Sequence, residues 1–177
     1  LNATQLQELH CLAFSELMHK TDFLKDYSIK QICALFSCFS NIKLTDADKN
    51  HYNSIEDKQL MTLLAEVELL YNKYFDIETS YKLDTGCDYN LTYDVLTYIM
   101  DWVDADSELL CEQVLQSLAH HNVFLGEFIK TLLKINNIAT ELEKVAEFNN
   151  NIDLLQKLHC IPSKTLKFIA TNQSLYV

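Results

Sequence analysis

The sequence predicts an all-α protein, a single bundle of about seven or eight helices. Only two glycines and one proline occur among 177 residues, too few for the turns and phosphate-binding loops of a β-sandwich, a Rossmann domain or a P-loop enzyme. Apolar residues make up 49% of the chain and recur at helical spacing almost throughout. Because this content can bury one sizeable core, we expect residues 1–177 to form one domain.

The N-terminal part predicts two helices. Thr4 can cap the first, whose apolar face consists of four residues at helical spacing: Leu6, Leu9, Ala13 and Leu17. The second begins at Ser28, because Ser28 and Gln31 have the spacing of a capping box, and it continues to Phe39. The polar stretch 40–53 then predicts a surface loop.

A long helix follows this loop. Residues 54–57 can cap it, and apolar side chains recur along one face at Leu60, Leu63, Leu64, Val67, Leu70, Tyr71 and Tyr74. A turn at 82–90, which contains Gly86, separates it from the next helix. That helix is expected to stop at the acidic turn 104–106 and carries five apolar residues: Leu91, Val95, Tyr98, Ile99 and Trp102.

Four further helices complete the predicted bundle. Ser107 can cap one that ends near residue 120. The asparagine run 149–151 ends a long helix that begins near residue 124. Pro162 disfavours helical geometry at the residue before it, so we expect two short helices, one on either side of this proline.

The charge composition excludes several classes of function. The formal net charge is −11, and all fourteen basic residues are Lys. We therefore expect neither a broad basic surface for nucleic acid or membranes nor the bidentate phosphate contacts that Arg provides. Apolar runs are far shorter than the roughly 20 residues that span a bilayer, so we expect no membrane segment.

Residues suited to catalysis or metal binding occur without the spacing that those sites need. The six cysteines include no CxxC pair, so we expect reduced, mostly buried thiols in a cytoplasmic or nuclear protein. Three pairs offer nitrogen or sulfur donors without the ligand spacing of structural zinc: His10 with Cys11, His120 with His121, and His159 with Cys160. No nucleophile motif is present. We therefore predict no catalytic, cofactor or metal site in this chain.

Three stretches nevertheless resemble a known family. Residues 14–41 read FSELMHKTDFLKDYSIKQICALFSCFSN and are similar to a family segment with TEL, a Phe, QI and ALLSCF. Residues 96–130 include LTYIMDWVDADS and NVFLGEFIK, where the family has VY.WA.G and FEGS followed by an apolar residue and IR. The end, 174–177, reads SLYV and resembles the family's SLYL. Over nearly its whole length the chain resembles the DSHCT domain, the C-terminal helical domain of Ski2-like DExH-box RNA helicases that serve the RNA exosome.

The resemblance implies a place in a larger enzyme. In such helicases two RecA-like domains bind and hydrolyse ATP with Mg²⁺, a winged helix packs on them, and the helical domain closes the channel over the RNA during 3′-to-5′ unwinding. The chain would then be a piece of a longer protein, with no catalysis or cofactor of its own. The implied partners are single-stranded RNA, the RecA-like and winged-helix domains of the same protein, and exosome-type proteins, with no membrane.

The resemblance also implies a site of RNA contact. In the family one long helix, the ratchet helix, faces the translocating strand, and here it starts near Gly126. The family's basic positions fall on Lys130 and Lys134, which stand at i and i+4 and so share one side of a helix. Two ammonium groups on one ridge can contact successive phosphates without reading the bases.

The chain departs from the family in its ratchet segment and at Pro162. Its ratchet segment, FIKTLLKINNIATELEK, contains no Arg, and Pro162 interrupts what the family builds as one terminal helix. The Arg-free, Asn-rich composition fits an A+T-rich genome, such as that of a protist or a large DNA virus. The net charge of −11 favours an alternative function, a non-catalytic acidic module that docks protein partners.

Overall fold

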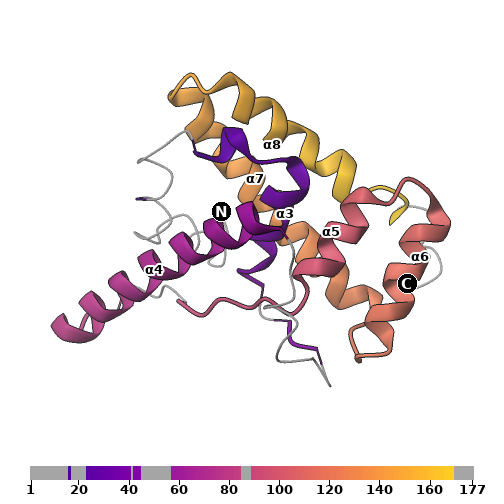
Figure 1. Ribbon diagram of the computed structural model, residues 1–177, viewed down its shortest axis with the longest axis horizontal. Helices are drawn as coiled ribbons and strands as arrows, with labels where there is room; N and C mark the ends of the chain where they lie inside the picture. Colours follow the sequence, from indigo (N-terminus) through magenta and orange to yellow (C-terminus); the bar gives the residue numbers. More distant parts are fainter. Residues whose placement is uncertain (1–15, 17–22, 41, 45–56, 85–88, 170–177) are drawn as a thin grey trace.

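The computed structural model is all-α, as predicted (Figure 1). It describes residues 16, 23–40, 42–44, 57–84 and 89–169. These residues form one 3₁₀ helix and six α-helices: η1 (Phe23–Asp26), α3 (Ile29–Ser37), α4 (Lys58–Tyr81), α5 (Leu96–Asp104), α6 (Glu108–Ala119), α7 (Leu125–Phe148) and α8 (Ile152–Thr165). The helix predicted from Thr4 and the SLYV end lie outside the described residues. None of the described helices is long and apolar enough to cross a membrane.

Helix α3 lies at the centre of the bundle and begins where the capping box predicts. The Ser28 hydroxyl accepts a hydrogen bond from the Gln31 backbone N–H at 3.2 Å, and Gln31 Oε1 accepts one from the Ser28 N–H at 2.9 Å. From Gln31 to Ser37 every residue of the helix is buried, so α3 packs on all sides. Helices α4, α5, α7 and α8 all contact it.

Helix α4 is coupled to α3 at its N-terminus. Asp57 caps α4 by accepting from the Leu60 N–H at 2.9 Å, and its other carboxylate oxygen accepts from Gln31 Nε2, also at 2.9 Å. The two helix starts are therefore tied to one carboxylate. The first half of α4 is buried on one face, whereas its second half extends away from the other helices (Figure 1).

The C-terminal end of α4 offers a direct test of backbone strain. Lys82 has φ 53° and ψ 40°, and the Leu83 N–H donates to the Glu78 carbonyl at 2.8 Å, the pattern of a Schellman motif. Because glycine adopts this left-handed conformation without steric cost, Lys82→Gly is expected to raise the free energy of unfolding by about 0.5–1 kcal/mol, measured by urea denaturation.

The matched control for this prediction is Asn150→Gly. Asn150 has φ 56°, but asparagine tolerates this region better than lysine does, so a smaller gain is expected. A loss of stability in Lys82→Gly would show that the Lys82 side chain contributes more than its backbone strain costs.

The start of α5 differs from the prediction, which placed Leu91 and Val95 in the helix. Residues 91–95 instead precede it, and the helix begins at Leu96. The Thr92 N–H donates to the Cys38 carbonyl at 2.8 Å, and the Asp94 carboxylate accepts from the Leu44 N–H at 2.9 Å. If the helix began at Leu91, the Thr92 N–H and the Asp94 carboxylate would point elsewhere and could not bind the segment after α3.

The prediction that Pro162 separates two short helices is wrong. Helix α8 runs through Pro162 and ends three residues later, at Thr165. Tertiary contacts hold this last turn: Thr165 is fully buried, its hydroxyl donates to the Ile161 carbonyl at 3.0 Å, and its own carbonyl accepts from Trp102 Nε1 at 2.8 Å. This packing outweighs the hydrogen bond that the proline cannot donate. The terminal helix is thus continuous across Pro162, so this departure from the family pattern disappears.

Candidate nucleic-acid interface

Helix α7 buries one face and presents the other to solvent. Its buried face packs against α3 and α8 and contains Leu125, Phe128, Thr131, Leu132, Ile135, Asn136, Ile138, Ala139, Leu142 and Ala146. The opposite face, here called the α7 ridge, consists of exposed residues that follow one another at spacings of three or four: Gly126, Lys130, Leu133, Asn137, Thr140 and Lys144. Because two other helices pack against this 24-residue helix, it is a rigid support for the ridge.

Lys130 lies on the α7 ridge, where the prediction requires a phosphate contact. Its side chain is exposed, and Leu133, one turn further on, is 45% exposed. At the start of the ridge, a Cβ built on Gly126 would meet no atom within 4 Å. The ridge is therefore exposed from Gly126 to Leu133, about its first two turns.

Lys134 lies beside the ridge and faces α3. It is half-buried, and its Nζ donates to the Phe39 carbonyl at 2.7 Å. The two predicted lysines are one turn apart, but only Lys130 projects freely into solvent; the ammonium of Lys134 binds the end of another helix. The predicted RNA contact of these two residues stays a prediction.

The structure adds a second exposed cation to the ridge that sequence reasoning missed. Lys144 lies fourteen residues after Lys130, about 21 Å along the helix axis. Its side chain is 69% exposed and pairs with Glu141 at 2.9 Å, an exposed i, i+3 pair that water screens strongly. The seven-residue spacing of Lys130, Asn137 and Lys144 was the signal that could have identified it.

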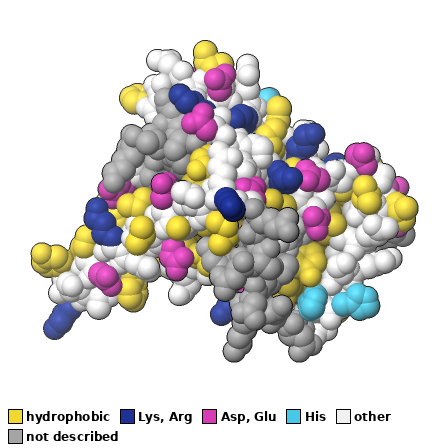
Figure 2. Space-filling view, in the orientation of Figure 1, with side chains coloured by type: hydrophobic (Ala, Val, Ile, Leu, Met, Phe, Trp, Pro, Cys, Tyr) yellow, Lys and Arg dark blue, Asp and Glu magenta, His cyan; other side chains and the backbone are white. Residues whose placement is uncertain are grey.

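Several other lysines bind groups of the protein itself. Lys157 donates to the carbonyls of Lys25 and Tyr27, and Lys167 donates to those of Val103 and Ala105. Burial lowers the pKa of Lys167 below its ordinary value. Figure 2 shows Lys and acidic side chains interspersed over the described part of one face of the molecule. Any attraction for a polyanion is therefore local.

Of the four described cysteines, three are buried and Cys160 is exposed. Cys33, Cys38 and Cys111 are buried, and burial raises the pKa of the Cys33 thiol to about 12 and that of Cys38 further still, so both remain protonated at neutral pH. His159 lies 3.8 Å from Glu143 across an exposed pair. Within the described ranges, no three His, Cys, Asp or Glu side chains lie close enough together to hold a metal ion.

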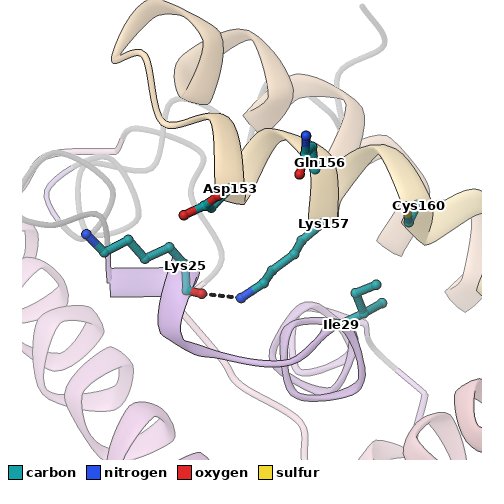
Figure 3. Close-up of a pocket in the computed structure, with 6 residues that line it drawn as sticks. All are labelled: Lys25, Ile29, Asp153, Gln156, Lys157 and Cys160. Atoms are coloured by element: carbon teal, nitrogen blue, oxygen red, sulfur yellow. Dashed lines mark hydrogen bonds between the residues drawn. The ribbon is translucent and has the colours of Figure 1, made fainter.

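A shallow, open pocket of about 290 Å³ lies between η1 and α8 (Figure 3). It is lined by Lys25, Ile29, Asp153, Gln156, Lys157 and Cys160. The Lys157 ammonium crosses the pocket to reach the Lys25 carbonyl, as Figure 3 shows, so it serves to join the two elements. The volume of the pocket is at the lower limit of small-molecule sites, and four of its six lining residues are polar or charged.

One of the comparisons with known proteins finds a family for this chain. The family model described as the DSHCT (NUC185) domain matches residues 2–169. No curated protein and no solved structure matches the chain. The match covers every residue that the structure describes, including the whole of α7. The chain therefore belongs to the DSHCT (NUC185) domain family, which forms the C-terminal domain of Ski2-like helicases.

Proposed function

We propose that this chain is the C-terminal helical domain of an ATP-dependent Ski2-like RNA helicase and that α7 is the helix along which single-stranded RNA passes during 3′-to-5′ unwinding. Membership of a family found in DExH-box helicases supports the enzyme class. The observation that carries the RNA contact is the α7 ridge, which projects Lys130 into solvent from a helix anchored on its other face. ATP and Mg²⁺ would be bound by the RecA-like domains, which also supply the catalysis.

The proposed contact is electrostatic and independent of sequence. An ammonium group on the ridge can meet a backbone phosphate, whereas no Arg is available for bidentate contact or stacking on bases. Because the chain carries a net charge of −11, contact with RNA would be weak in the isolated domain and would depend on the helicase core to hold the strand nearby. RNA processing or decay is the process in which this helicase would act.

Charge reversal at Lys130 tests the proposal. Lys130→Glu is expected to weaken binding of single-stranded RNA by about tenfold at 50 mM salt, because it replaces a phosphate contact with repulsion. Binding is measured by fluorescence anisotropy of the 177-residue chain at about 50 and 200 mM salt, and wild-type binding should nearly vanish at the higher concentration. In the full helicase the same change should reduce RNA-stimulated ATP hydrolysis.

The matched control is Lys58→Glu, an exposed lysine at the start of α4 that undergoes the same change of charge. If the affinity for RNA falls by the same factor in both variants, the loss reflects net charge, and the α7 ridge is not the RNA site. Undiminished binding in Lys130→Glu would contradict the ridge assignment, and circular dichroism of both variants checks that the fold is retained.

A second candidate function is an acidic docking module for protein partners. It is favoured by the net charge of −11 and by the engagement of Lys134, Lys157 and Lys167 with backbone carbonyls, which keeps these three ammonium groups from an external ligand. If the folded chain binds no RNA at either salt concentration, the docking function is favoured instead.

A further inference from the structure

The end of α3 uses donors from distant parts of the chain. The last carbonyls of a helix have no partner within it and need donors from elsewhere when they are buried. The carbonyl of Cys38, the C-cap of α3, accepts from the Thr92 N–H at 2.8 Å, and that of Phe39, in the turn that continues the helix end, accepts from Lys134 Nζ at 2.7 Å. Phe39 is only 5% exposed, so water is a poor substitute for the ammonium group.

We propose that Lys134 is a positioning residue: it clamps the middle of α7 against the C-terminal end of α3 and thereby holds Lys130 in place, without contacting RNA itself. A cation is favoured at this location because the end of a helix carries partial negative charge, and a hydrogen bond from an ammonium is stronger than a neutral one. Lys130 is one turn away on the same rigid helix, so movement at Lys134 displaces it. The RNA part of this inference rests on the proposed function, whereas the clamp does not.

Two further lysines are used in the same way. Lys157 Nζ donates to the carbonyls of Lys25 and Tyr27 at the end of η1, and Lys167 Nζ donates to those of Val103 and Ala105 at the end of α5. Helices commonly end at a glycine, and this chain has only two glycines. Lysine side chains from other elements therefore cap helix ends here, which supports a structural role for Lys134.

A double-mutant cycle separates a clamp from a ligand. The variants are Lys130→Met, Lys134→Met and the double variant, because Met keeps most of the side-chain volume and removes the ammonium. We expect Lys134→Met to lower Tm by about 3–6 °C and to speed hydrogen exchange of the Cys38–Ser40 amides about tenfold, while Lys130→Met changes neither. RNA affinity should fall a few-fold in Lys134→Met, but not when Lys130 is already Met. Lys134→Arg, which keeps a cationic donor, should restore both readouts.

The alternative results are equally distinct. An affinity loss in Lys134→Met that adds fully to that of Lys130→Met, with unchanged exchange at α3, would make Lys134 an RNA ligand and overturn the proposal. Unchanged Tm and exchange would also overturn it, whatever the affinity. If the wild-type chain binds no RNA, the proposed function fails alone, and the Tm and exchange comparison still supports or refutes the clamp.

Discussion

Trp102→Ala is expected to lower the free energy of unfolding by about 3–5 kcal/mol, the largest effect of any substitution considered. Trp102 is fully buried, and its ring meets Phe128 of α7 edge-to-face with centroids 5.1 Å apart. Its Nε1 also donates to the Thr165 carbonyl at 2.8 Å. Truncation therefore leaves a cavity where α5, α7 and α8 meet and removes the donor that holds the end of α8.

Urea unfolding followed by far-UV circular dichroism measures this loss; fluorescence is unsuitable because Trp102 is the only tryptophan. Phe148→Ala is the matched control, since Phe148 is 87% exposed and its truncation should change stability by less than about 0.5 kcal/mol. Trp102→Phe keeps a ring and loses the N–H, so it should cost about 1–3 kcal/mol. Equal, small losses in the two alanine variants would show that Trp102 does not hold the core together.

Helix starts that carry a capping side chain were predictable because their signals are local. The Ser28 and Gln31 capping box and the Ser107 cap each lie within four residues, and the structure confirms both. The predicted cap at 54–57 is Asp57. Such contacts form as soon as the backbone turns, whatever packs on the helix later, so the sequence alone carries the information.

The two errors in the fold share one physical cause. At the start of α5 and at Pro162, local preference was overruled by hydrogen bonds from residues far away in the chain. Thr92 reaches Cys38 across 54 positions, and Trp102 reaches Thr165 across 63. No pattern within a helix-sized window records such a partner, so spacing rules failed at both places.

The same limit applies to the candidate site. The resemblance placed the long helix and Lys130 where the structure shows an exposed ridge. Spacing could not show that Lys134 meets the Phe39 carbonyl, 95 positions away. An i, i+4 pair shares a side of its helix, but whether both members face solvent depends on where the neighbouring helices end.

The second large effect concerns a buried polar contact between α7 and α8. Asn136, only 8% exposed, donates from Nδ2 to the Leu132 carbonyl at 2.7 Å and to the Thr165 hydroxyl at 2.8 Å. That hydroxyl donates onward to the Ile161 carbonyl at 3.0 Å. The Thr165 carbonyl also accepts a hydrogen bond from Trp102 Nε1. Asn136 is therefore part of a contact that joins α5, α7 and α8. The group that matters is the amide donor.

Asn136→Asp replaces this donor with an oxygen of nearly the same size and is expected to cost about 3 kcal/mol at pH 7, because an ionised carboxylate would be buried against the Leu132 carbonyl, which can only accept. Burial raises the folded-state pKa of the introduced carboxyl above its unfolded value of about 3.9. Relative to the wild type, stability is therefore retained below the unfolded pKa, where the protonated acid can donate, and is lost as the pH rises through the folded-state pKa.

Urea denaturation of the variant and the wild type between about pH 4 and 7 measures this difference. Asn137→Asp is the matched control: the same substitution, at the next residue, on the exposed ridge. Its carboxyl stays in water, so its stability difference from the wild type should be small and independent of pH in this range. A constant deficit in Asn136→Asp would show that ionisation of the new carboxyl does not cause the loss, whereas a deficit that closes as the pH falls would show that a donor at this position stabilises the contact between α7 and α8.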